Sequence, residues 1–369
     1  MHRLLPAGLA SLSVKIFCAN RADLFLQNYI TFCPRLKLKS VNFDIYQPSP
    51  NGARISLSEI HQLSQAICLH NHLDSLELSI PIDHVALRQV MLSVRLKSAS
   101  LVLHPTESNL RNIGITSTDI PFCNVKDLEL LVWDLRFVSS LLRPRDQMFH
   151  SFRLRLDTLR EARAVFSFLT ALASPQRTHS LQSVHLTFGN LYANSRERFN
   201  IPYDNALHCL TYGVLQPLTS LEHLRDLRLL SNQTFLTDEQ LKSLVCSWPM
   251  LEVLQLNCTN GCYGTPITLR GLLSVLALCP RLRDLSLSVD ARRIPERTSA
   301  TADVRNTMLT SLALPDSPIR DACRVAVFLS RHLPSVTYVD VYFIHTPSVA
   351  YRPPSRYGSL WVKVNEHLG

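Results

Sequence analysis

Histidine and cysteine side chains are the first candidates for chemistry, because they bind metals and act as bases or nucleophiles. The chain of 369 residues contains 14 histidines and 10 cysteines. Zinc sites commonly use cysteines in a C-x2-C pair, whereas Cys258 and Cys262 are spaced C-x3-C and have no second pair beside them. We therefore expect no metal site. The dispersed thiols favour a reducing compartment, the cytoplasm or the nucleus.

Motifs for nucleotide binding or nucleophilic catalysis give no stronger candidate. The chain contains no G-x4-G-K-[ST], G-x-G-x-x-G, G-x-S-x-G or H-E-x-x-H sequence. We therefore expect no enzymatic activity, no catalytic residue and no cofactor.

The charge is basic, with 38 Lys and Arg against 29 Asp and Glu and a net charge of +9. A basic excess attracts acidic partners over long distances. An alternative function is therefore a basic repeat protein that binds nucleic acid or another anionic ligand, although no Arg/Lys block is interleaved with aromatic residues. No apolar run reaches the length of about 18 residues that a membrane span needs, so we expect no membrane partner.

The elements that must position any site come from one recurring pattern, apolar-x-x-apolar-x-apolar. The clearest copies begin at Leu251, Leu282 and Leu309. Spacings between copies run from 23 to 43 residues and average about 30. Eight clear and four weaker copies begin at Leu9, Leu38, Leu73, Leu96, Val125, Phe149, Leu181, Leu224, Leu251, Leu282, Leu309 and Val336.

The spacing within each copy predicts a short strand. The fourth and sixth positions lie two residues apart, so they point to the same face. Segments between the copies have helical periodicity, for example 58–70, 159–173, 237–247 and 268–278. Parallel strands need such crossover helices. The sequence therefore predicts an α/β horseshoe solenoid with parallel strands on the concave side and helices on the convex side.

This solenoid should occupy residues 1–345 and contain about twelve irregular repeats. Residues 346–369 would form a C-terminal cap or tail, in which 360–364 alternates like a strand.

Several details resemble leucine-rich-repeat proteins of the ribonuclease-inhibitor or cysteine-containing type, and more narrowly the repeat region of fungal F-box/leucine-rich-repeat proteins. They are the Cys-Pro-Arg-Leu segments at Cys33 and Cys279, the Leu-Arg-Asp-Leu segments at Leu224 and Leu282, and the irregular repeat lengths. The resemblance implies a protein-binding scaffold that recognises a ubiquitin-ligase substrate while other subunits perform the chemistry. The F-box itself would be absent or degenerate, because the first strand begins near residue 11. A ligase adaptor would then be a partner only if an F-box is encoded upstream.

The fifth position of each copy should face solvent on the concave side. Charged residues cluster there and at the neighbouring outward positions, acidic in the early repeats and basic in the middle ones. We expect this face to bind a protein substrate that carries an acidic segment. The candidate residues are Glu77, Glu129, Arg153, Arg155, His185 and Arg228. We also expect the long strand-to-helix loops to contribute a binding rim beside this face; they are residues 44–54, 104–119, 187–204, 257–268 and 290–303. The alternative is that the charges merely pair with one another across neighbouring strands.

Overall fold

The fold is described by a computed structural model of the chain. The described residues are 9–16, 38–45, 57–103, 113–116, 119–142, 147–156, 162–175, 177–188, 210–231, 234–258, 266–296, 304–341 and 357–369. The chain divides into two compact units, Met1–Arg155 and Leu156–Gly369. Most of the long strand-to-helix loops, and Cys262 of the C-x3-C pair, lie outside the described residues.

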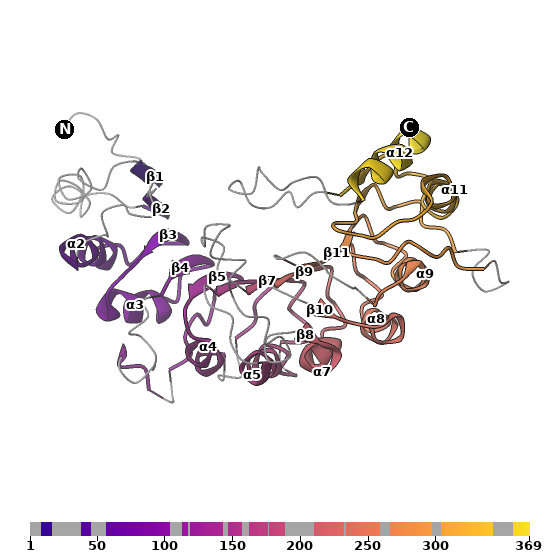
Figure 1. The fold of residues 1–369 in the computed structure, drawn as a ribbon. Coiled ribbons are helices and arrows are strands. Elements are labelled where there is room, and N and C mark those ends of the chain that lie inside the picture. Colours follow the sequence, from indigo (N-terminus) through magenta and orange to yellow (C-terminus); the bar gives the residue numbers. More distant parts are fainter. Residues whose placement is uncertain are drawn as a thin grey trace. The chain divides into compact units, whose positions relative to one another are not determined.

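The first unit alternates strands with helices. Its strands lie side by side in chain order, and the helices α2, α3 and α4 cover one face of the sheet (Figure 1). Strands β1 to β5 pair with their neighbours in parallel. The elements are β1 (Ser11–Ile16), β2 (Ser40–Ile45), α2 (Leu57–Cys68), β3 (Ser75–Pro81), α3 (His84–Met91), β4 (Ser98–Val102), β5 (Asp127–Val132), α4 (Leu135–Leu141) and β6 (Ser151–Leu156), whose last residue belongs to the second unit.

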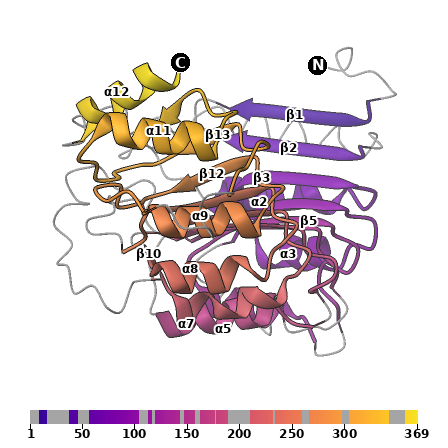
Figure 2. The same cartoon turned by 90° about the vertical axis from the view of Figure 1, so that its right-hand side faces the viewer.

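The second unit repeats this plan. Helices α8, α9 and α11 lie side by side in front of the strands (Figure 2), and the strand order is β7-β9-β11-β12-β13-β14. Strands β8 and β10 form a separate parallel pair. The elements are α5 (Ala162–Leu172), β7 (Ser183–Phe188), β8 (Leu210–Thr211), α7 (Tyr212–Leu215), η5 (Gln216–Ser220), β9 (Asp226–Ser231), β10 (Thr234–Phe235), α8 (Asp238–Val245), β11 (Val253–Cys258), α9 (Leu269–Leu278), β12 (Asp284–Leu287), β13 (Ser311–Ala313), α11 (Ala322–His332), β14 (Val339–Asp340) and α12 (Gly358–Leu368).

The apolar anchors of the repeats form the core of each unit. Fourth-position anchors are in register from strand to strand: Val41, Leu76, Ala99 and Leu128 in the first unit, and Val184, Leu227, Leu254, Leu285, Leu312 and Val339 in the second. All of them are buried. Burial of one large aliphatic side chain contributes roughly 1.5–3 kcal/mol before the entropic cost of ordering it. The predicted leucine-rich-repeat fold, with parallel strands on one face and helices on the other, is confirmed.

The helices begin where the sequence provides caps. Thr237 and Gln240 form a reciprocal capping box at the start of α8, and Thr268 caps α9 through the backbone amide of Arg270. The Asp238 carboxylate accepts hydrogen bonds from the backbone and side chain of Thr268. This contact joins the starts of two consecutive helices, so capping also fixes the spacing of the repeats.

The C-terminal segment 360–364 is helical, so the prediction of a strand there is wrong. It lies inside α12, which packs against α11 and buries Trp361 and Val364. The side-chain amide of Asn365 accepts a hydrogen bond from the Val339 amide nitrogen at 2.8 Å and donates one to the Val339 carbonyl at 3.0 Å. A side chain thus satisfies backbone groups of β14, the last strand in the sheet order, which would otherwise be left open. Whether residues 346–369 act as a separate cap stays a prediction.

Candidate functional site

The strand face is the side of each sheet opposite the helices, and its side chains come from the outward positions of each repeat. In the first unit, Asn42, Glu77, Ser100 and Glu129 occupy equivalent positions on neighbouring strands. In the second unit the equivalent row is His185, Arg228, Gln255, Ser286, Ala313 and Asp340. All six candidate residues lie on this face, since β6 carries Arg153 and Arg155.

Glu129 brings the two candidate arginines of the first unit together. Its carboxylate lies 3.1 Å from Arg155 and 3.8 Å from Arg153. The arginine side chains remain about half exposed, while the carboxylate is more covered. Glu77 has a different partner, because the Asn42 amide donates to it at 2.7 Å. Glu129 and the two arginines therefore form one charge-paired group, and Glu77 lies outside it.

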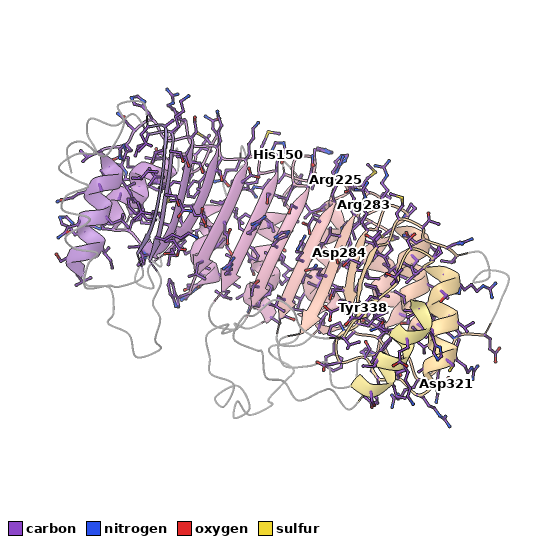
Figure 3. The ribbon with its side chains drawn as sticks, turned by 90° about the horizontal axis from the view of Figure 1, so that it is seen from above. His150, Arg225, Arg283, Asp284, Asp321 and Tyr338 are labelled. Atoms are coloured by element: carbon purple, nitrogen blue, oxygen red, sulfur yellow. The ribbon has the colours of Figure 1, made fainter. Side chains whose placement is uncertain are left out.

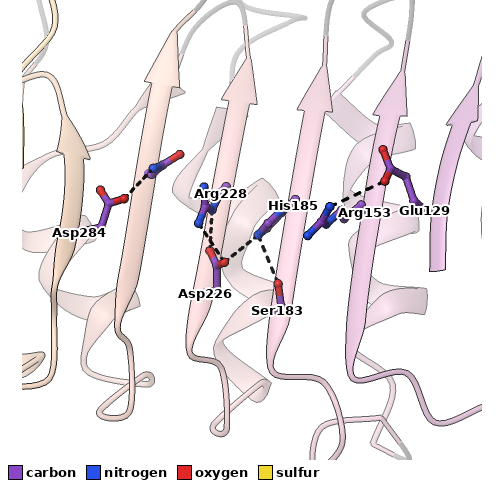
Figure 4. A network of polar contacts seen from close by, with 8 residues as sticks. Glu129, Arg153, Ser183, His185, Asp226, Arg228 and Asp284 are labelled. Carbon is purple, nitrogen blue, oxygen red and sulfur yellow. Dashed lines mark hydrogen bonds and ion pairs between the residues drawn. The ribbon is translucent and has the colours of Figure 1, made fainter. Parts of the chain in front are cut away.

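A second group surrounds Asp226 in the other unit (Figure 4). His185 Nε2 lies 2.9 Å from the Asp226 carboxylate, and Arg228 Nε donates to the same carboxylate at 2.9 Å. Burial alone raises the pKa of Asp226, but the hydrogen bonds from His185 and Arg228 outweigh burial and hold this pKa below its usual value. The sequence analysis considers charge pairing across neighbouring strands only as an alternative; the structure shows Asp226 paired with both His185 and Arg228.

Ser183 completes a serine, histidine and aspartate set, but its geometry differs from that of a catalytic triad. Ser183 Oγ and the Asp226 carboxylate both approach Nε2 of His185, at 3.2 and 2.9 Å. In a triad the carboxylate orients the imidazole through the opposite ring nitrogen, which leaves Nε2 to take the serine proton. This arrangement therefore does not activate Ser183. Among the described residues, no group of three or more His, Cys, Asp or Glu side chains could hold a metal ion.

Two outward positions are more covered than the repeat pattern predicts. Gln255 is 7% exposed and Ser286 is 5% exposed, so the expectation that both face solvent is wrong. Gln255 donates to the Asp284 carboxylate at 3.2 Å on the next strand. Close strand spacing lets neighbouring side chains cover one another, an effect that the pattern of a single strand does not contain.

The positions just before the strands hold charged residues that the sequence analysis did not single out. In most repeats the second residue donates its backbone amide to the carbonyl of the equivalent residue one repeat earlier, as Lys97 does to Asp74 and Lys126 does to Lys97. Reading this second position down the twelve aligned copies would have found them. In the second unit, Arg225 and Arg283 occupy it and project from the starting edge of the strands (Figure 3).

Together, repeated strand-helix units, a registered aliphatic core and a polar strand face define the leucine-rich-repeat class of architecture. No protein-family model matches the chain, and no curated protein matches it. Among solved structures, a chain of the yeast Rad7 and Elc1 complex is similar, with 15% identity and a TM-score of 0.43, over 91% of this chain and 87% of that chain. A likeness at this level carries no functional argument. No helix among the described residues is long and apolar enough to cross a membrane.

Proposed function

We propose that the protein is a protein-binding scaffold that uses the strand face of its repeats. The observation that carries this proposal is the polar strand face of each unit, where Glu129 pairs with Arg153 and Arg155 and Asp226 pairs with His185 and Arg228. Side chains that are already ordered lose less entropy when a partner binds. Repeats stacked in one direction also offer an extended surface rather than a small pocket.

The finer proposal is substrate recognition of the F-box/leucine-rich-repeat ubiquitin-ligase type, without intrinsic catalysis. The partner would be a protein with an acidic segment, because the candidate arginines remain partly exposed beside their carboxylates. Co-purification of a ligase adaptor with the protein would support the ligase role, and failure of the adaptor to co-purify would contradict it. The cytoplasm or the nucleus is the proposed compartment, consistent with the free thiols of Cys68, Cys123, Cys246, Cys279 and Cys323.

A capture experiment with matched variants tests the binding role. Immobilised wild-type chain is compared with R153E/R228E, which reverses two charges on the strand face, and with R163E/R270E, which reverses two exposed charges on helices α5 and α9. We expect the same proteins to be retained by wild type and by the helix variant and lost from the strand-face variant. Equal retention by all three folded proteins contradicts a role for the strand face.

A further inference from the structure

The first unit has three lysines in a row of five residues at the start of its strands. This entry row consists of the residues that precede β2 to β6, namely Lys39, Asp74, Lys97, Lys126 and His150. Backbone hydrogen bonds of 2.7–2.8 Å link each member to the next. Neighbouring strands lie about 4.8 Å apart, so the lysines project from closely spaced points along one edge.

The cations of this edge are not balanced locally. Lys97 approaches Asp74 at 3.6 Å, but its side chain is 66% exposed, and such surface pairs contribute little. Within the described part of the chain, no carboxylate pairs with Lys39, Arg95 or Lys126. Lys97 and Lys126 lie on adjacent strands, where like charges are destabilising. An anionic partner would relieve this repulsion.

An apolar pocket is lined by Val94 and Leu96, which alternate with the cations Arg95 and Lys97 along the chain. Its volume is about 300 Å³, and it lies between the segments that lead into β3 and β4. Buried Leu73, Leu76 and Leu96 line it together with Val94, which is 68% exposed. Burial lowers the pKa of the lining residue His70, so the ring is neutral near pH 7 and adds no charge to the wall.

Hydrogen bonds fix the two segments that frame this pocket. Asn124 donates its side-chain amide to the Val94 carbonyl at 2.7 Å, and Gln89 donates to the Cys68 carbonyl at 3.0 Å. Val94 is followed directly by Arg95 and, two residues later, by Lys97. The structure therefore holds an apolar cavity and a pair of cations on one short segment.

We infer that the entry row and this pocket together bind a peptide segment in which a large apolar side chain is followed by acidic residues. The apolar side chain fills the pocket, and the carboxylates meet Arg95, Lys97 and Lys126. This inference deepens the proposed function and rests on it: it adds the strand-entry edge of the first unit as a further place where acidic residues of the partner meet cations.

The surroundings of the cations favour a peptide over a nucleic acid. Met148 is 57% exposed beside the entry-row residue His150, and Val94 is exposed beside Arg95. A phosphate backbone gains nothing from such apolar neighbours, whereas a peptide with mixed acidic and apolar side chains buries them.

The test measures binding of defined fluorescent peptides to the full chain by anisotropy. One peptide carries a single phenylalanine followed by a run of glutamates, a second has serine in place of the phenylalanine, and a short single-stranded DNA serves as the nucleic-acid probe. We expect the phenylalanine peptide to bind at least about tenfold more tightly than the other two probes. DNA binding as tight as peptide binding overturns the inference in favour of a nucleic-acid surface.

Matched variants locate the site. We expect K97E/K126E and V94S each to weaken binding of the phenylalanine peptide by about tenfold or more. The controls are R281E/R283E, which makes the same charge change at the starting edge of the second unit, and V327S on α11, where the valine is 70% exposed. Both controls should bind within about twofold of wild type.

Equal losses in the K97E/K126E and R281E/R283E variants mean non-specific attraction and overturn the inference. Absence of peptide binding to wild type also overturns it. Neither result touches the proposed function, which is judged by the strand-face variants in the capture experiment. All variants change exposed side chains, and an unchanged unfolding midpoint confirms that each is folded.

Discussion

The entry row occupies the second position of the repeat and the strand-face row occupies the fifth. Charged residues occur in both rows, but their electrostatic surroundings differ. On the strand face, Glu129 pairs with Arg153 and Arg155, and Asp226 pairs with His185 and Arg228. Along the entry row of the first unit, Lys126 follows Lys97 on the adjacent strand, and no carboxylate of the described residues forms an ion pair with Lys126. The candidate arginines of the face therefore have carboxylate partners while remaining partly exposed, whereas Lys126 of the entry row retains charge that a partner can neutralise.

The largest expected loss of unfolding free energy comes from the buried anchors, which lie on the side of the strands that faces the helices. Leu285→Ala removes a buried anchor that is in register with Leu254 and Leu312, and should cost about 2–5 kcal/mol of unfolding free energy. Urea denaturation measures the change. The control Ser311→Ala alters an exposed outward position of β13 and should stay within about 0.5 kcal/mol. An unchanged urea midpoint for Leu285→Ala would show that the fourth-position anchors do not form a packed core.

The backbone of β14, the last strand in the sheet order, is paired by the side chain of Asn365 from α12. Asn365→Ala leaves the Val339 amide and carbonyl without their side-chain partner, and should destabilise the protein by about 1–3 kcal/mol. Glu366→Ala, at an exposed position of the same helix, is the control. Hydrogen exchange of the Val339 amide gives a local readout, and protection retained in Asn365→Ala would contradict the capping contact.

A smaller change in stability should distinguish Asp226, which is paired on the strand face, from an ordinary exposed carboxylate. Because the pKa of Asp226 is lowered in the folded protein, its ionised form stabilises the fold above the unfolded pKa, and this contribution is lost as the pH falls below about 4. Asp226→Asn should therefore cost about 1 kcal/mol at pH 7 and much less near pH 3. The exposed Asp127→Asn serves as the comparison. A cost for Asp226→Asn that does not change with pH would show that ion pairing is not its cause.

The repeat pattern predicted the strands and their buried anchors because each copy contains its own periodicity. Caps such as Thr237 were also readable, since they depend on residues three or four apart. The pairing of Asp226 with His185 and of Glu129 with Arg153 and Arg155 was not, because contacts between strands depend on the register of segments that lie dozens of residues apart. Arg228 lies two residues from Asp226 on the same strand, so the repeat pattern could have shown that pair. Residues 360–364 were misread because a short alternating run fits a strand, while packing of Trp361 against α11 selects the helix.

Matched charge reversals test the contrast between the two regions most directly. Arg228→Glu removes a cation paired with Asp226 and places a second carboxylate beside it, so the unfolding free energy should fall by about 1 kcal/mol or more. Lys126→Glu places a carboxylate beside Lys97, so the unfolding free energy should be unchanged or rise by a few tenths of a kcal/mol, roughly. Chemical denaturation of both variants at low and high salt measures the difference. Opposite responses that shrink as salt is added are the predicted result, and equal destabilisation by both reversals would contradict the account.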